Sequence, residues 1–106
     1  MGFFDSLFGP DINKGLAMWR GMSEGVLIDV RDPAEYEAGH IPGSVNVPMD
    51  SLSRITADWP DRNTPLFLYC AIGRRSKQVA SLLQALGYAN VTSIGGIKGY
   101  KGELEK

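Results

Sequence analysis

Two hydrophobic patterns alternate along this chain. Short continuous apolar runs, rich in β-branched and aromatic residues, are typical of buried strands, and we expect strands at 26–30, 45–47, 66–69 and 90–94. Helical spacing, together with capping residues, predicts helices at 11–22, 32–38, 50–59 and 76–86. The polar tail, 97–106, has room for one or two helical turns. Short strands that alternate with helices favour a parallel sheet.

The fold class expected from this order is α/β, with a central, mainly parallel sheet of four to five short strands and helices on both faces. Residues 11–106 are expected to form one domain, preceded by an N-terminal apolar segment at 1–10 that packs back onto the domain or lies beside it. In the helix at 76–86, the apolar residues that share a face are expected in the core: Val79, Leu82, Leu83 and Leu86. Ligands of such sheets collect beyond the carboxyl ends of the strands.

The chain has a single cysteine, Cys70, directly after the apolar run at 66–69. A loop that contains Gly73 leads from this cysteine to a helix predicted from Ser76. Glycine lets successive backbone amides turn inward, and a helix N-terminus attracts negative charge. Arg74, Arg75 and Lys77 add positive charge. These features together predict an anion site around a thiolate, with the pKa of Cys70 lowered.

The spacing within this loop restricts the chemistry. Cysteine phosphatases place an arginine six positions after the cysteine, where it grips the phosphoryl group through two hydrogen bonds. That position is Ser76 here, and Arg75 comes one residue earlier. A shorter loop is tighter, which suits a sulfur atom better than a phosphate.

Several motifs resemble the single-domain rhodaneses, which are sulfurtransferases. The stretch 70–76 resembles that family's Cys-x-x-Gly-x-Arg-Ser active loop. The stretches 27–31, 35–36 and 39–48 resemble its N-terminal signature, and Gly95-Gly96 its late glycine pair. The match runs in the expected order from about Val26 to Tyr100, where the family often has tryptophan.

The resemblance implies a mechanism. The Cys70 thiolate takes a sulfur from a small anionic donor such as thiosulfate, carries it as a persulfide, and passes it to a thiol or protein acceptor. The resemblance implies that loop residues hold the substrate, and this set comprises Ala71, Ile72, Gly73, Arg74, Arg75, Ser76 and Lys77. Within it, Arg74 and Lys77 are expected to attract the donor at the rim, whereas Arg75 either binds substrate or braces the loop through Asp29 or Glu35.

Three residues outside the loop are candidates for supporting roles. Asp29 lies at the carboxyl end of the strand expected at 26–30, on the same edge of the sheet as Cys70, and we expect it to support the site from behind. Arg31 is expected either to pair with a local carboxylate or to reach the site. His40 lies in a Gly-His-Ile-Pro-Gly turn, which favours a structural role over proton transfer.

Composition narrows the possible partners. The formal net charge of −1 disfavours nucleic acid, whose binding needs a clear basic excess. One cysteine and one histidine exclude an intrachain disulfide and a cysteine or histidine metal cluster, so neither a metal nor a cofactor is expected. No secretory signal or membrane-spanning run is evident, membrane contact is not expected, and a reduced, cytoplasmic location is the expectation.

Two alternatives come from other functional classes. A rhodanese-like interaction or regulatory module would bind partners without catalysis, but such a module has no need of a nucleophile such as Cys70. A small cysteine phosphatase or arsenate reductase would share the reactive cysteine. The short distance in sequence from Cys70 to Arg75 argues against the second alternative.

Overall fold

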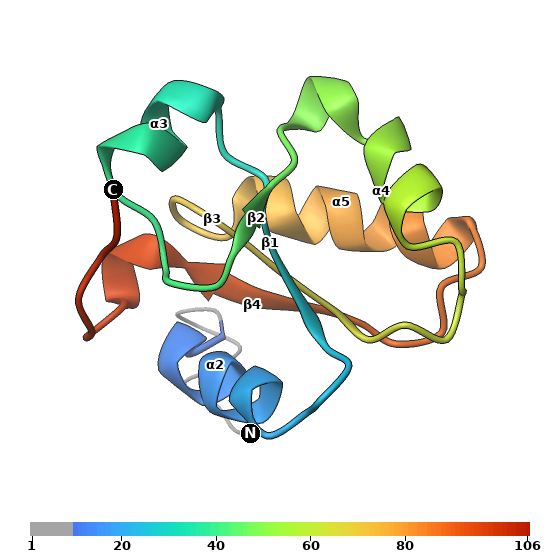
Figure 1. The fold of residues 1–106 in the computed structure, drawn as a ribbon, viewed down its shortest axis with the longest axis horizontal. Helices are drawn as coiled ribbons and strands as arrows, with labels where there is room; N and C mark the ends of the chain where they lie inside the picture. The colour runs from blue at the N-terminus through green and yellow to red at the C-terminus, as the bar shows by residue number, and fades with distance from the viewer. Residues whose placement is uncertain (1–9) are drawn as a thin grey trace.

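Four parallel strands form the central sheet of the domain (Figure 1). The computed structural model of the chain describes residues 10–106, so nearly all of the expected N-terminal segment lies outside the described residues. The strand order is β2-β1-β3-β4, and every neighbouring pair is parallel. The strands are β1 (Val26–Asp29), β2 (Val45–Asn46), β3 (Leu66–Cys70) and β4 (Val91–Gly96). The predicted α/β class and parallel sheet are confirmed.

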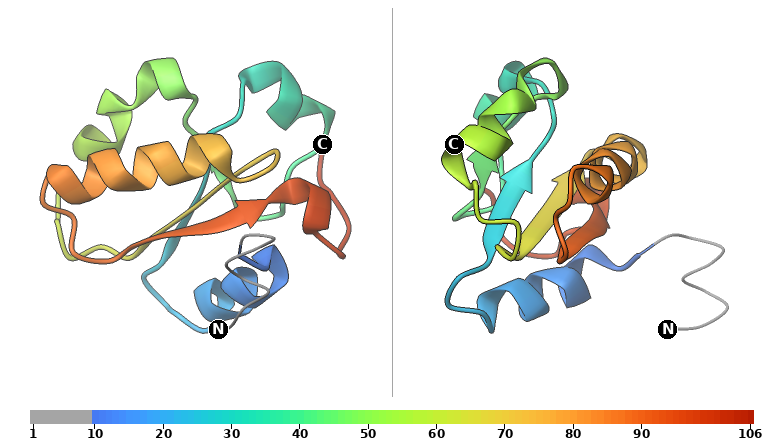
Figure 2. Two further views of the ribbon diagram at one scale, coloured as in Figure 1. Left: turned by 180° about the vertical axis from the view of Figure 1, so that it is seen from behind. Right: turned by 90° about the vertical axis from the view of Figure 1, so that its right-hand side faces the viewer.

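Helices cover both faces of this sheet (Figure 2). In chain order they are α2 (Ile12–Arg20), α3 (Pro33–Ala38), the 3₁₀ turn η1 (Met49–Ser51), α4 (Ser53–Asp58), α5 (Arg74–Ala85) and the 3₁₀ turn η2 (Ile97–Gly99). Two apolar clusters lie on opposite faces of the sheet. One joins Val79 and Leu83 of α5 to Ile55 of α4, and the other contains Ile12 and Leu16 of α2.

The central strand β3 belongs to both clusters because its side chains alternate between the faces. Leu66, Leu68 and Cys70 face α5, and Phe67 and Tyr69 face α2. All five residues are buried. Cys70 therefore ends a strand that is covered on both sides, which fixes the position of its backbone at the carboxyl edge of the sheet.

Several local expectations differ from the structure. The helix around 50–59 is split into η1 and α4, and the residue that precedes α4 is Leu52, not Asp50 or Ser51. The last strand continues through Gly95 to Gly96 across a register shift opposite Leu68 and Tyr69, where glycines had been expected to end it.

The side of α5 that faces the core is also narrower than its apolar residues suggested. Val79 and Leu83 are buried, but Leu82 and Leu86 are 44% and 47% exposed. The helix packs on a single sheet face, so only one narrow stripe, which also includes Ala80 and Ser76, meets the strands. Leu82 and Leu86 are therefore surface residues, and their assignment to the core was wrong.

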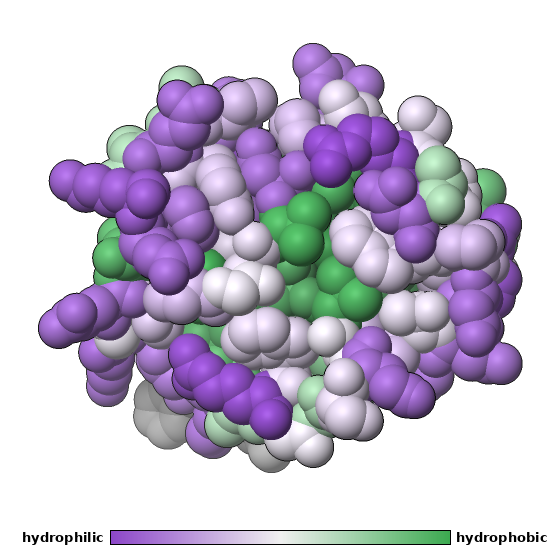
Figure 3. Space-filling model, in the orientation of Figure 1, coloured by the Kyte–Doolittle hydropathy of each residue, from purple (hydrophilic) through white to green (hydrophobic). Residues whose placement is uncertain are grey.

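The end of the chain returns to the connection between α3 and β2 (Figure 1). His40 and Glu105 form an antiparallel bridge with two backbone hydrogen bonds, each 2.8 Å long. Figure 3 shows apolar surface gathered in the middle of the face seen in Figure 1, surrounded by hydrophilic side chains. Within residues 10–106, no helix combines the length and apolar character needed to cross a membrane.

Candidate active site

Cys70 lies where β3 turns into α5, and only 1% of the residue is exposed. The turn is made by Gly73, whose φ of 97° and ψ of −7° place it in the left-handed region that favours glycine. The helix begins at Arg74, two residues earlier than expected. Its first turn therefore includes Arg74, Arg75 and Ser76, and its N-terminal end is directed at the cysteine.

The sulfur atom of Cys70 receives hydrogen bonds from this turn. The backbone N–H of Gly73 lies 3.0 Å from Sγ and that of Ser76 lies 3.4 Å away. The Ser76 hydroxyl is 3.5 Å from Sγ. Burial acts to raise the pKa of Cys70, but the Ser76 hydroxyl and the amides of Ser76, Gly73 and Ile72 outweigh it, so the pKa is lowered. The arrangement favours a thiolate.

Ser76 is completely buried, and its hydroxyl has further neighbours. Its Oγ lies 3.2 Å from the carbonyl oxygen of Gly73 and 2.8 Å from Oγ of Ser93 in β4. Ser93 was not among the residues singled out from the sequence. Strand register is the signal that places Ser93 here. Ser93 pairs with Leu68, and Leu68 lies on the same face of β3 as Cys70.

Arg75 pairs with Glu35 of α3. Its two terminal nitrogens lie 2.9 and 3.2 Å from the two carboxylate oxygens, which is a two-point ion pair. Of the two partners considered from the sequence, Glu35 is therefore the one that Arg75 contacts. The hydrogen bonds from Arg75, aided by the backbone N–H of Asp32 and opposed by partial burial, lower the pKa of Glu35 to about 2.

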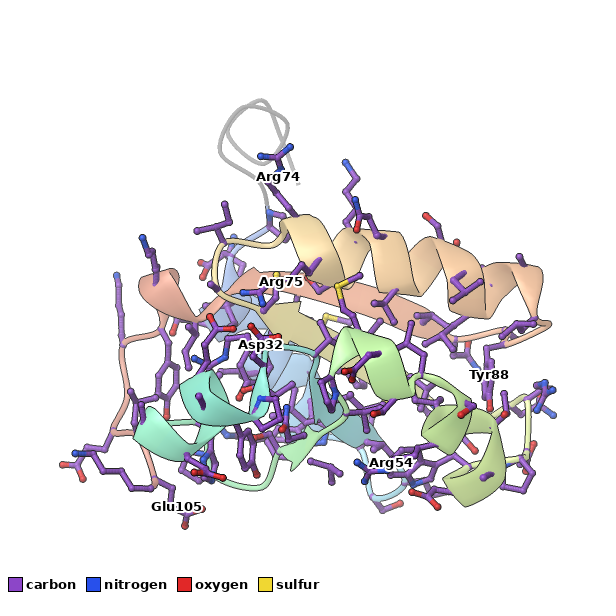
Figure 4. The ribbon with its side chains drawn as sticks, turned by 90° about the horizontal axis from the view of Figure 1, so that it is seen from above. Asp32, Arg54, Arg74, Arg75, Tyr88 and Glu105 are labelled. Atoms are coloured by element: carbon purple, nitrogen blue, oxygen red, sulfur yellow. The ribbon has the colours of Figure 1, made fainter. Side chains whose placement is uncertain are left out.

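Arg74 and Lys77 are exposed, in contrast to Arg75. Figure 4 shows Arg74 pointing away from the domain, while Arg75 points across toward α3 and Asp32. Ile72, at the tip of the loop, is 60% exposed. The two adjacent arginines thus lie in different environments, one in solvent and one in an ion pair.

Asp29 and Arg31 pair with each other. Nε and Nη2 of Arg31 lie 2.8–3.1 Å from the Asp29 carboxylate, and Nη2 also donates to the carbonyl oxygen of Gly39 at 2.7 Å. Both residues are buried. Of the two possibilities for Arg31, pairing with a local carboxylate is the one observed. Within residues 10–106, neither side chain forms a hydrogen bond with the loop at 71–77.

Two glycines of β4 allow the loop to approach the sheet closely. A Cβ added at Gly96 would lie 2.4 Å from the carbonyl oxygen of Ala71 and 2.6 Å from Cα of Ile72. Both are backbone atoms, which have no freedom to move aside. At Gly95 the φ is 115°, a conformation that L side chains rarely adopt. Glycine is therefore required at Gly96 by the loop that lies against it, and at Gly95 by its backbone conformation and by the carbonyl oxygen of Pro10, 2.7 Å from where a Cβ would lie.

Polar contacts of Tyr69 join the sheet to the segment between α3 and β2, and those of His40 join this segment to α3. The Tyr69 hydroxyl accepts from the Ile41 N–H at 3.1 Å and donates to Ser44 Oγ at 3.2 Å. The His40 ring stacks on Tyr36, and its Nδ1 lies 2.8 Å from the Tyr36 carbonyl oxygen. These contacts are consistent with a structural role for His40. Residues 10–106 contain no group of three side chains suited to binding a metal.

Comparison with known proteins identifies the family of this domain. Residues 16–103 match the family model described as "Rhodanese-like domain". The chain belongs to the rhodanese-like family. It is 39% identical over 72 residues to "Thiosulfate sulfurtransferase PspE" of Escherichia coli K12, which covers 67% of this chain and 69% of that protein.

Two further comparisons agree with this placement. "Thiosulfate sulfurtransferase GlpE" of Tolumonas auensis is 36% identical over 76 residues, which is 71% of each chain. The solved structure titled "rhodanese with anions from E. coli" is 35% identical, with a TM-score of 0.72, covering 77% of this chain and 98% of that one. The names of the relatives support a sulfurtransferase activity.

The buried pair of Asp29 and Arg31 leads to a prediction about stability. Arg31→Met would leave the Asp29 carboxylate buried without its partner, and we expect the free energy of unfolding to fall by about 3–5 kcal/mol. Arg20→Met removes an exposed arginine and should change it by less than about 0.5 kcal/mol. Urea denaturation of both variants measures the difference. Equal, small losses of unfolding free energy in the two variants would contradict a stabilising role of the Asp29–Arg31 pair.

The lowered pKa of Glu35 leads to a prediction about pH. A carboxylate with a lowered pKa stabilises the folded state above its unfolded pKa, near 4.5, and this contribution is lost as the pH falls toward about 2. Glu35→Gln should therefore be less stable than the wild type at neutral pH, by ~1 kcal/mol or less because the pair is partly exposed. The difference should disappear over that acidic range. Glu37→Gln, an exposed change on the same helix, is the control. A stability difference between Glu35→Gln and the wild type that does not change with pH would contradict the lowered pKa of Glu35.

Proposed function

We propose that this protein is a thiosulfate sulfurtransferase that carries sulfur on Cys70. The observation that carries the proposal is the position of Cys70 Sγ, within hydrogen-bond distance of two backbone amides and one hydroxyl at the start of α5. A thiolate held in this way is a nucleophile that needs no separate base. The thiosulfate sulfurtransferases among the relatives support thiosulfate as the donor.

The first half-reaction loads the cysteine. The Cys70 thiolate attacks the outer sulfur of thiosulfate, and a new S–S bond forms as the original one breaks. The bonding electrons leave with sulfite, so no external oxidant or reductant is needed. Cys70 then carries a persulfide, which the amides of 71–76 would surround.

The second half-reaction unloads the sulfur. The thiolate of an acceptor attacks the outer sulfur of the persulfide, and Cys70 leaves as the thiolate from which the cycle began. Because Cys70 is 1% exposed, a large acceptor has poor access to Sγ itself. The persulfide extends the reactive atom by an S–S bond of about 2 Å, which brings it closer to an acceptor thiol outside the loop.

The environment of the loop supports sulfur transfer over phosphate chemistry. Both terminal nitrogens of Arg75 are held by the Glu35 carboxylate, so they are not free to grip a phosphoryl group through two hydrogen bonds. Ser76 occupies the position of the phosphatase arginine and is buried beneath Cys70. We therefore assign Arg75 to bracing the loop against α3.

The exposed charges beside the loop suit an anionic donor. Arg74 and Lys77 are both exposed on the first turn of α5, next to the mouth of the loop. Their field would raise the local concentration of a divalent anion without direct contact with the reacting sulfur. A compartment that keeps thiols reduced would protect the thiolate, and we propose the cytoplasm.

A mass measurement tests the loading step. The protein is incubated with thiosulfate, and its intact mass is measured before and after treatment with a reductant. We expect a gain of one sulfur atom that the reductant reverses, and no gain in Cys70→Ser. Because the chain has one cysteine, the modified residue is unambiguous.

Two results, one from this measurement and one from a separate phosphatase assay, would reject the proposal. The lack of a gain with thiosulfate and with other donors of reduced sulfur would favour a rhodanese-like interaction module. Turnover of an aryl phosphate by the wild type, lost in Cys70→Ser, would favour a phosphatase.

The role of the exposed charges leads to a second test. Arg74→Gln combined with Lys77→Gln should raise KM for thiosulfate several-fold at low ionic strength and leave kcat nearly unchanged. The effect should shrink as salt is added, because salt screens exposed charges. Arg20→Gln is the control. It removes an exposed charge at the end of α2, and the chain continues from there to the start of β1, at the amino ends of the strands and not at their carboxyl ends, where Cys70 lies. An equal fall of kcat at every salt concentration would contradict steering.

A further inference from the structure

Ser93 contacts the site from the neighbouring strand, although it lies outside the loop. It pairs with Leu68, and a residue in register on an adjacent strand has its side chain on the same face. Leu68 and Cys70 both face α5, so Ser93 lies beneath the start of that helix. Its hydroxyl is 2.8 Å from that of Ser76, and Ser76 is its only side-chain partner within residues 10–106.

The Ser76 hydroxyl has a single proton and three neighbours that accept hydrogen bonds. These are the Gly73 carbonyl oxygen at 3.2 Å, Ser93 Oγ at 2.8 Å and Cys70 Sγ at 3.5 Å. Ser76 is completely buried, so water is not available to complete its hydrogen bonds. The neighbour that receives the proton therefore depends on the state of the sulfur.

When Cys70 is a thiol, its S–H donates to Ser76, and Ser76 donates onward to either of two acceptors, Gly73 or Ser93. When Cys70 is a thiolate, the sulfur needs donors, and the Ser76 proton turns toward it. The Ser76 oxygen has then lost the S–H as a donor. Among the described residues, the only side-chain hydroxyl positioned to replace it is that of Ser93. Loss of Ser93 is therefore more costly to the thiolate than to the thiol.

We propose that Ser93 is a positioning residue that donates to Ser76 whenever Ser76 donates to the sulfur, and so favours the anionic form of Cys70. A donated hydrogen bond polarises the Ser76 hydroxyl and strengthens its own bond to sulfur. Ser93 touches neither the donor nor the reacting atom and acts through Ser76 alone. The inference rests on the proposed role of Cys70 as the nucleophile.

The test compares two variants of nearly equal shape. Ser93→Thr keeps a hydroxyl, and Ser93→Val replaces it with a methyl group; both residues suit a strand. The ultraviolet absorbance of the thiolate is followed against pH, with Cys70→Ser as the baseline. The midpoint for Ser93→Val should lie about half a unit to one unit above that of Ser93→Thr, which corresponds to one hydrogen bond. Ser81→Ala, an exposed change on α5, should keep the wild-type midpoint.

A double-mutant cycle tests the route of the effect. Ser76→Ala should also raise the midpoint, and addition of Ser93→Val should then produce no further shift, because the intermediate hydroxyl is gone. Equal midpoints for Ser93→Thr and Ser93→Val would overturn the proposal, as would shifts that add in the cycle. The titration uses no sulfur donor, so a negative result would reject the role of Ser93 while the mass measurement decides the role of Cys70.

Discussion

A buried sulfur anion must be satisfied by hydrogen bonds, and much of this structure meets that requirement. Cys70 ends the most enclosed strand, where burial alone would keep the thiol protonated. The turn at Gly73 directs two backbone amides at the sulfur, and β4 has no side chain at Gly96 that would hold the loop away. The start of α5, the left-handed Gly73 and the glycine at position 96 therefore all help to bring hydrogen-bond donors to the buried sulfur.

The neighbouring arginines show how adjacent positions acquire different roles. Successive residues in the first turn of a helix point in directions about 100° apart. Arg75 is directed toward α3, where Glu35 holds it, and Arg74 is directed into solvent. If both side chains were free, the loop would have more positive charge but less support. The ion pair with Glu35 uses the charge of Arg75 to fix the loop and leaves the charge of Arg74 at the surface.

Much of the fold could be predicted from local sequence, since apolar runs and capping residues marked the strands and helices. The candidate site was predicted where its residues are contiguous, as in the loop from Cys70 to Lys77. Glu35 and Asp29 were both open as partners of Arg75, because sequence does not specify how far a side chain reaches. Ser93 was missed since its position depends on strand register, and Leu82 and Leu86 were misplaced because the stripe of α5 that meets the sheet is narrow.

If Cys70 carries sulfur as we propose, the presence of a single cysteine has a consequence for how long that sulfur is held. Enzymes with a second cysteine nearby can discharge a persulfide internally, by closing a disulfide and releasing hydrosulfide. This chain has no second thiol with which to do so. A loaded molecule would keep its sulfur until another molecule arrives, and a second copy of the chain would have to bring its own enclosed Cys70 to the loop. The time for which Cys70 holds its sulfur would therefore be set by the arrival of an acceptor molecule.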